Sequence, residues 1–173
     1  MIDCYVMPIK SGKTRILVER AVREIVDNES CVVYISFDDT RQYVHQLACD
    51  LLQLNDEFDA VKNRFKYLDV PRGRFNINTL AEICKMFQYE VDIVIVDCAD
   101  AMFKNGEKPY LRSINSFVDC YKTISLLGEK YGKDFIFEFQ DSADGAVYDD
   151  FVKLQNSLGY KVCNEKIDIS VSR

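Results

Sequence analysis

Residues 2–14 read Ile-Asp-Cys-Tyr-Val-Met-Pro-Ile-Lys-Ser-Gly-Lys-Thr, an apolar run that ends in a polar turn. The run 2–7 is typical of a buried β-strand, and residues 14–26 have apolar side chains at helical spacing. A strand followed by Gly-Lys-Thr and a helix is the pattern of a phosphate-binding loop. In such a loop the N–H groups at the helix start face the phosphates. The stretch therefore predicts an α/β fold with an anion site where the first helix begins.

The loop pattern, known as Walker A, assigns a role to each of its last four residues. Backbone groups of Ser11 and Gly12 would hold the phosphates of a nucleotide such as ATP. Lys13 would reach the β- and γ-phosphate oxygens, and the Thr14 hydroxyl would bind Mg²⁺. The full pattern begins with a glycine, and Met7 stands at that position here. The alternative is a chance Gly-Lys-Thr at a helix start, but the strand before it and the helix after it favour phosphate binding.

Beyond this loop, strand-like and helix-like segments alternate along the chain. The segment 91–97 is the clearest of several continuous apolar runs, which are typical of parallel strands covered on both faces. The alternation predicts a single domain over residues 1–173, with a three-layer fold in which a mostly parallel sheet lies between helices. The expected strands are 2–7, 31–37, 65–70, 91–97, 134–140 and 166–171, and the expected helices are 14–26, 40–54, 56–63, 78–88, 111–131 and 148–158.

The composition narrows the class of protein. The chain has 173 residues, 48% of them hydrophobic and 29% charged, which allows a core without metals or disulfides. A net charge of −6 argues against direct, sequence-independent DNA binding. The seven cysteines include no C-x-x-C pair and His45 is the single histidine, so we expect reduced cysteines and no zinc site. With no membrane-spanning run and no signal peptide, the sequence indicates a cytoplasmic protein that binds no membrane.

Two acidic residues follow the predicted strand 31–37. A carboxylate at Asp38 would polarise an attacking water molecule, which makes it a candidate catalytic residue. The alternative is that this turn only starts the next helix. Asp39 or Thr40 is expected to cap that helix, because short oxygen-bearing side chains accept hydrogen bonds from the first N–H groups of a helix.

Polar residues also end two other predicted strands. Asp97 follows the aliphatic run 91–96, where a Walker B aspartate holds Mg²⁺ through water or through Thr14. A turn or capping aspartate is the alternative. Gln140 ends the strand 134–140, where an amide would sense the γ-phosphate, and a solvated strand end is an equal alternative. Since ligands of parallel sheets bind at the carboxyl ends of the strands, we expect these residues at one site.

The order and spacing of these segments resemble the ATPase domain of the hexameric DnaB-type replicative helicases, a branch of the RecA-like P-loop proteins, with the phage helicases nearest. Residues 33–38 are similar to the family strand that ends in Ser-Leu-Glu, whose glutamate is the catalytic base. Residues 94–102 are similar to the Walker B segment Val-Asp-Tyr-Ala-Asp-Leu-Leu. Residues 117–140 are similar to the helix and strand that end in the Ser-Gln sensor. With 68–80 and 157–173, the resemblance covers nearly the whole chain.

The chain also departs from the family pattern. Met7 replaces the first loop glycine, and Asp38 is one methylene shorter than the family glutamate. Cys98 replaces the usual tyrosine. The sequence ends at Arg173, before the strands that in this family carry the arginine finger. From the resemblance we therefore expect slow ATP hydrolysis or none, and no DNA unwinding by the isolated chain.

Two functions follow from the resemblance. The first is a nucleotide-binding module derived from a replicative helicase, with ATP and Mg²⁺ as cofactors and weak or partner-dependent ATPase activity. The second is a catalytically inactive RecA-like scaffold that acts through a protein partner or a homo-oligomer in DNA replication or phage biology. A third and weaker interpretation takes residues 97–100, Asp-Cys-Ala-Asp, as a decayed D-E-A-D box.

The resemblance also implies a strand order. In RecA-like proteins the sensor strand lies between the Walker A and Walker B strands. We therefore expect 134–140 to separate 2–8 from 91–97, with 31–37 next to the latter and 65–70 at or beyond that edge. At the other edge, beside 2–8, we expect the strand 166–171.

Overall fold

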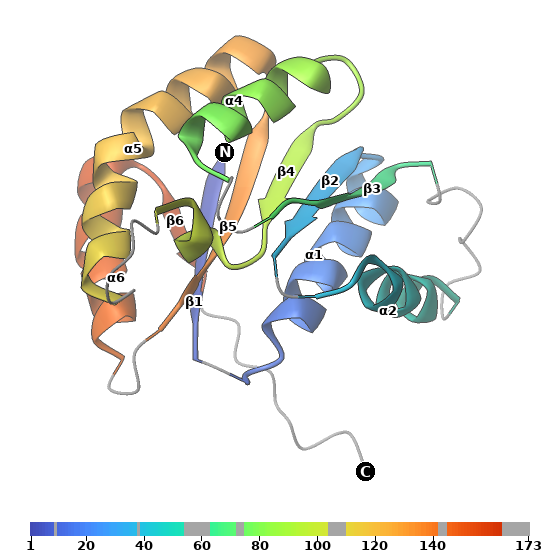
Figure 1. Ribbon diagram of the computed structural model, residues 1–173, viewed down its shortest axis with the longest axis horizontal. Helices are drawn as coiled ribbons and strands as arrows, with labels where there is room; N and C mark the ends of the chain where they lie inside the picture. Colours follow the sequence, from blue (N-terminus) through green and yellow to red (C-terminus); the bar gives the residue numbers. More distant parts are fainter. Residues whose placement is uncertain are drawn as a thin grey trace.

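A computed structural model describes residues 1–8, 10–37, 39–53, 63–71, 75–103, 110–141 and 145–163. In these residues six strands form one sheet of order β3-β2-β4-β5-β1-β6, and every pairing in it is parallel (Figure 1). The strands are β1 (Ile2–Met7), β2 (Val32–Ser36), β3 (Phe65–Asp69), β4 (Ile93–Val96), β5 (Asp134–Gln140) and β6 (Lys161–Cys163).

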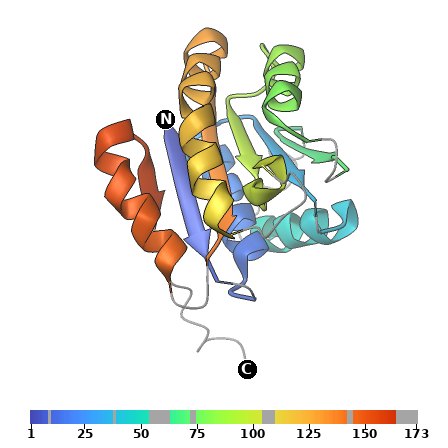
Figure 2. The same ribbon diagram turned by 60° about the vertical axis from the view of Figure 1, so that its left-hand side comes forward.

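Helices cover both faces of this sheet, so the three-layer α/β prediction is confirmed. Figures 1 and 2 show α1 and α2 on one side of the sheet and α4, α5 and α6 on the other. A short 3₁₀ helix, η2, follows β4 directly. The helical elements are α1 (Lys13–Asn28), α2 (Arg41–Gln53), α4 (Ile77–Met86), η2 (Ala99–Phe103), α5 (Tyr110–Tyr131) and α6 (Ala146–Leu158).

The alternation of side chains along each strand produces two separate hydrophobic cores. In β5, Phe135, Phe137 and Phe139 belong to the core under α4, α5 and α6, while Ile136 belongs to the core under α1 and α2. The continuous apolar runs in the sequence reflect this double coverage, because neither face of a central strand meets water.

The expected strand order is confirmed for five strands. β5 separates β1 from β4, with Phe135 in register with both Ile2 and Val94. β3 lies at the far edge, beyond β2. The segments 56–62 and 164–173 lie outside the described residues, and with them nearly all of the expected helix 56–63 and the whole of the expected strand 166–171.

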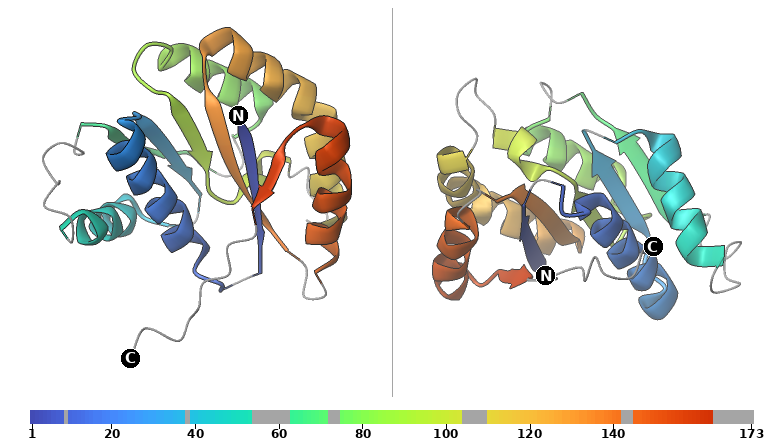
Figure 3. Two further views of the ribbon diagram at one scale, coloured as in Figure 1. Left: turned by 180° about the vertical axis from the view of Figure 1, so that it is seen from behind. Right: turned by 90° about the horizontal axis from the view of Figure 1, so that it is seen from below.

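The edge position beside β1 is held by β6, an element that we did not predict (Figure 3). Gly159 ends α6 with a φ of 80°, in the left-handed region that glycine adopts at low cost. The chain therefore turns at once, buries Tyr160 in the aromatic core and pairs from Lys161 onward. A strand of this length has too few residues to show a period in the sequence.

Helix α4 shows how local sequence fixes a boundary. The Asn76 side chain accepts hydrogen bonds from the N–H groups of Asn78 and Thr79, at 2.9 and 3.2 Å, and so caps the first turn. No helix among the described residues is long and apolar enough to cross a membrane. The seven cysteines all lie within the described residues and form no disulfide.

Candidate functional site

Helix α1 begins immediately beyond the carboxyl end of β1, as the Walker A pattern predicts. Gly12 is its N-cap residue, with φ of 78°, and Lys10 also has a positive φ of 63°. These left-handed conformations fold the chain sharply between strand and helix, and the Ser11 N–H donates to the carbonyl of Pro8 at 3.4 Å. Gly12 has no side chain that could cap the first turn of α1. The first N–H groups of α1 therefore point to the carboxyl edge of the sheet, where an anion is favoured.

Thr14, in the first turn of α1, lies between two carboxylates. Its Oγ1 atom is 2.5 Å from Oδ2 of Asp39 and 3.3 Å from Oδ2 of Asp97. The two acids come from the turns that follow β2 and β4, which are neighbouring strands. The predicted pairing of Thr14 with Asp97 is therefore present, and Asp39 joins it.

Asp97 is almost completely buried and holds a second polar contact. The hydroxyl of Tyr34, on β2, donates to Oδ2 of Asp97 at 2.8 Å. Burial raises the pKa of Asp97, while the Tyr34 hydrogen bond and the nearby Lys13 act against that rise. Burial and the Asp97 charge raise the pKa of Tyr34 well above its usual value, so its hydroxyl stays a donor.

Lys13, beside Thr14, turns toward the middle of the sheet. Its Nζ atom is 2.9 Å from Oε1 of Glu138 on β5, whose side chain is completely buried. The other carboxylate oxygen of Glu138 accepts the N–H of Cys98 at 3.0 Å. Cys98 directly follows Asp97 and has a φ of 62°, an uncommon conformation for a residue other than glycine.

Burial raises the pKa of Glu138 to about 7, because the attraction of Lys13 offsets only part of the cost of removing this carboxylate from water. Burial acts to lower the pKa of Lys13, but the charge and hydrogen bond of Glu138, together with the Asp97 charge and Cys98, outweigh it, and the pKa of the ammonium group is raised. Lys13 therefore stays charged at neutral pH, whereas Glu138 gains or loses its proton near neutral pH.

A second carboxylate links the same two strand ends. The N–H of Gln140, the last residue of β5, donates to Oδ2 of Asp100 at 2.7 Å. Asp100 lies in η2, directly after β4, and is buried. The turn after β4 and the end of β5 are thus joined twice, once through Glu138 and once through Asp100.

The structure brings together most of the residues that the sequence singled out. Lys13, Thr14 and Asp97 meet at the carboxyl edge on the α1 face of the sheet. The Ser11 hydroxyl is buried with no hydrogen-bond partner among the described residues. Gln140 lies two residues beyond Glu138 in β5, and so on the same face. Asp38 lies outside the described residues.

The sequence predicted that Asp39 or Thr40 would cap α2, and the structure assigns that role to Thr40. The Tyr43 N–H donates to Thr40 Oγ1 at 3.3 Å. Thr40 thus caps the helix, and the Asp39 carboxylate contacts Thr14 instead.

The sequence reasoning also missed Tyr34 and Glu138. A usable signal existed for Glu138: in the strand 134–140 phenylalanine alternates at 135, 137 and 139, so the residue at 138 must face the opposite core. A glutamate at the centre of an otherwise apolar strand needs a partner. Tyr34 gave no such signal, because a tyrosine in a buried strand is an ordinary core residue.

The oxygen-bearing side chains of this site could hold a Mg²⁺ ion that is also bound to nucleotide phosphates. No group of three or more His, Cys, Asp or Glu side chains within the described residues could hold a metal ion without other ligands. Mg²⁺ commonly binds through one or two carboxylates together with substrate phosphates and water. The Thr14 hydroxyl and the Asp97 and Asp39 carboxylates are oxygen donors that fit that ligand set.

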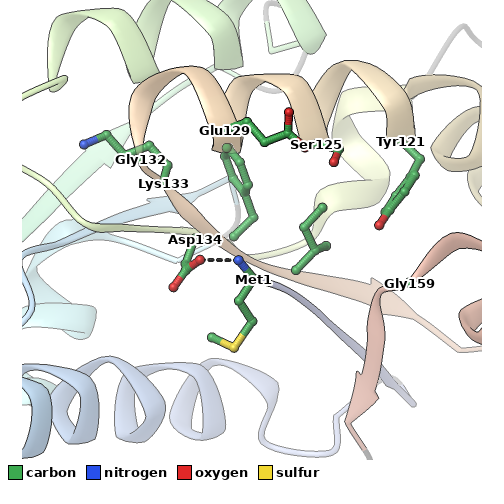
Figure 4. A pocket seen from close by; sticks show the side chains of 11 residues that line it. Met1, Tyr121, Ser125, Glu129, Gly132, Lys133, Asp134 and Gly159 are labelled. Atoms are coloured by element: carbon green, nitrogen blue, oxygen red, sulfur yellow. Dashed lines mark hydrogen bonds and ion pairs between the residues drawn. The ribbon is translucent and has the colours of Figure 1, made fainter.

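A separate hollow of about 490 Å³ lies at the opposite, amino-terminal end of β1 and β5 (Figure 4). Tyr121, Ser125 and Glu129 line it from α5. The amino group of Met1 forms an ion pair with Asp134 on its floor. None of the residues of the candidate site lines this hollow, so the hollow is not part of that site.

No model of a known protein family matches the chain, and a search of curated proteins finds no match either.

Proposed function

We propose that the domain binds a nucleoside triphosphate, ATP, together with Mg²⁺ at the carboxyl edge of its sheet. The observation that carries this proposal is the position of Thr14, in the first turn of α1 and within hydrogen-bond reach of Asp97. A hydroxyl at a helix start beside an acid that follows another buried strand of the same sheet is what phosphate-bound Mg²⁺ requires.

Each residue has a role in this proposal. The N-terminus of α1, with Ser11 and Gly12, holds the phosphates, and Lys13 neutralises their outer oxygens. Thr14 and Asp97 hold Mg²⁺, which supplies charge neutralisation to the phosphates when bound. Burial raises the pKa of Asp97, and a cation bound beside its carboxylate would favour the charged form.

Hydrolysis is proposed to be weak or to depend on a partner. Asp38 would orient the attacking water and Gln140 would sense the γ-phosphate, as in the DnaB-type helicases that the sequence resembles. The charge that develops in phosphoryl transfer needs further stabilisation, which an arginine from another subunit provides in P-loop enzymes. We propose that this chain is a RecA-like module of that kind, acting in the cytoplasm in DNA replication or phage biology.

A second candidate is an inactive RecA-like scaffold that works through contacts with a protein partner or a second copy. One observation favours it: the Lys13 ammonium group already has a buried carboxylate partner at 2.9 Å. A lysine held in this way is not poised to meet phosphate. The presence of Met7 at the position of the first loop glycine also favours this second candidate.

Thermal unfolding with increasing Mg-ATP distinguishes the two candidates. Binding raises the free energy of unfolding by RT ln(1 + [L]/Kd), which is about 2.7 kcal/mol at a hundredfold excess over Kd. We expect this stabilisation in the wild type and its loss in Lys13→Ala, each compared with its own ligand-free midpoint. Lys153→Ala removes an exposed lysine that pairs with Asp150 on the same helix, and serves as the control. Equal stabilisation of wild type and Lys13→Ala would exclude the proposed site.

A further inference from the structure

The lysine that the proposed function places on phosphate is held in this structure by a carboxylate inside the protein. The Lys13 side chain is 18% exposed and the Glu138 side chain 0% exposed, with 2.9 Å between Nζ and Oε1. β5 lies between β1 and β4, so Glu138 sits in the middle of the sheet, below the loop. A phosphate at the start of α1 and this carboxylate therefore attract the same ammonium group from different directions.

Glu138 also fixes the turn that follows Asp97. Its Oε2 atom accepts the Cys98 N–H at 3.0 Å, and Cys98 holds a φ of 62°. A positive φ costs energy in a residue with a side chain, so this hydrogen bond stabilises a strained turn. One buried carboxylate thus contacts the loop lysine with one oxygen and the turn after the Walker B aspartate with the other.

We propose that Glu138 is a positioning residue that competes with nucleotide phosphate for Lys13. Nucleotide binding then transfers the Lys13 ammonium group from Glu138 to the phosphates, and Glu138 keeps the affinity lower than the loop alone would give. This inference rests on the proposed nucleotide binding.

The transfer has a consequence for protons. The charged and titratable groups that face Glu138 are Lys13 on α1, Asp97 in the turn after β4, Asp100 in η2 and the Tyr34 phenol on β2. Lys13 is the cation of this set, so its departure leaves a buried carboxylate beside two acids. A carboxylate in that position takes up a proton. Because the bound state holds the extra proton, affinity falls as the pH rises above about 7, the pKa of Glu138 while Lys13 is still beside it.

Isothermal calorimetry on the whole chain tests the proposal, with Mg-ATP and Mg-ADP between about pH 6 and about pH 9, a span that includes the Glu138 pKa. Glu138→Gln keeps an acceptor for the Cys98 N–H but carries no charge. We expect it to bind Mg-ATP about tenfold more tightly than wild type at pH above 7, and to lose the steep pH dependence. Glu24→Gln is the matched control, since Glu24 is also buried and pairs with Arg20 at 2.6 Å on the same helix as Lys13. The Glu24→Gln variant should keep the wild-type affinity and pH profile. That profile includes any pH dependence that comes from titration of the nucleotide phosphates.

A second measurement needs only the wild type. Calorimetry in buffers of different ionisation enthalpy counts the protons taken up on binding, and we expect a value approaching about one just above neutral pH. Binding that depends on Lys13 but shows no proton uptake, or a Glu138→Gln affinity no higher than wild type, overturns this inference and leaves the proposed function standing. Absence of Mg-ATP binding in both wild type and Glu138→Gln overturns both.

Discussion

The two faces of the sheet differ in character, although the same strands contribute side chains to both. Toward α5 and α6, Phe137 and Phe139 of β5 meet Phe117, with ring centroids 6.1 and 5.3 Å from it. Toward α1, the same strand presents Ile136 and then the buried Glu138. Along β5 the first face carries Phe135, Phe137 and Phe139, whereas the second changes from apolar at Ile136 to charged at Glu138.

This difference shows how a small domain can carry a site that is costly to fold. Burial raises the pKa values of Asp97 and Glu138, which means that their charged forms are less stable in the protein than in water. The opposite face contains an aromatic cluster that gains stability from the same strands. Stability and candidate chemistry are thus separated by the alternation of side chains, and substitutions on the two faces should have separable effects.

The strongest test of this separation is Phe117→Ala. Phe117 is fully buried and its ring contacts those of Phe139, Phe151 and Tyr160. We expect the free energy of unfolding to fall by roughly 3–5 kcal/mol, measured by urea denaturation. The stabilisation by Mg-ATP, measured from the new midpoint, should be unchanged. Leu126→Ala, at an exposed position on the same helix, should change stability by less than about 0.5 kcal/mol. A Phe117→Ala variant that stays as stable as the control would contradict this division of roles.

The next effect comes from Glu138 and depends on pH. The folded protein raises the pKa of this group from 4.5 to about 7, so the folded state binds more protons than the unfolded state in that interval. The free energy of unfolding should therefore fall as the pH rises from about 4.5 to about 7 and then level, by about 3 kcal/mol at most. Denaturation of wild type and Glu138→Gln at several pH values isolates this contribution. A difference between the two proteins that does not vary with pH would show that Glu138 is not destabilised by burial.

The smallest effect compares one tyrosine hydroxyl on each face. Tyr34 donates to the Asp97 carboxylate at 2.8 Å, and Tyr160 donates to the carbonyl of Phe151 at 2.7 Å. We expect Tyr34→Phe to cost roughly 1–2 kcal/mol where Asp97 is charged, and less at low pH, because its acceptor is a carboxylate. Tyr160→Phe should cost about 1 kcal/mol at every pH, since its acceptor does not titrate. Identical pH profiles for the two variants would argue that the Tyr34 bond does not support a charged Asp97.

The sequence predicted those parts of the fold that long apolar runs specify. The strand around Ile93–Val96 and the turn to Asp97 could be recognised because a buried parallel strand is apolar on both faces and its polar end stands out. The strand β6 could not be recognised, because it has three residues. Its position depends on the turn at Gly159 and on the burial of Tyr160, which are tertiary effects.

The candidate site was predictable only where a residue type and its neighbours form a known pattern. Lys13, Thr14 and Asp97 belong to such patterns, and the structure places them together. Asp39 belongs to no such pattern, since its contact with Thr14 depends on the backbone angles of the turn after β2. Glu138 belongs to no such pattern either. Its partner Lys13 is distant in sequence and becomes a neighbour only when β5 pairs with β1.

The paired hydrogen bonds between the ends of β4 and β5 have a mechanical meaning. Cys98 donates from the β4 side to Glu138, and Gln140 donates from the β5 side to Asp100, so the two bonds run in opposite directions. Neither the turn after β4 nor the end of β5 can shift alone without breaking a bond to a buried carboxylate. The two segments are therefore mechanically coupled, and a displacement of Glu138 that followed movement of Lys13 would act on both of them.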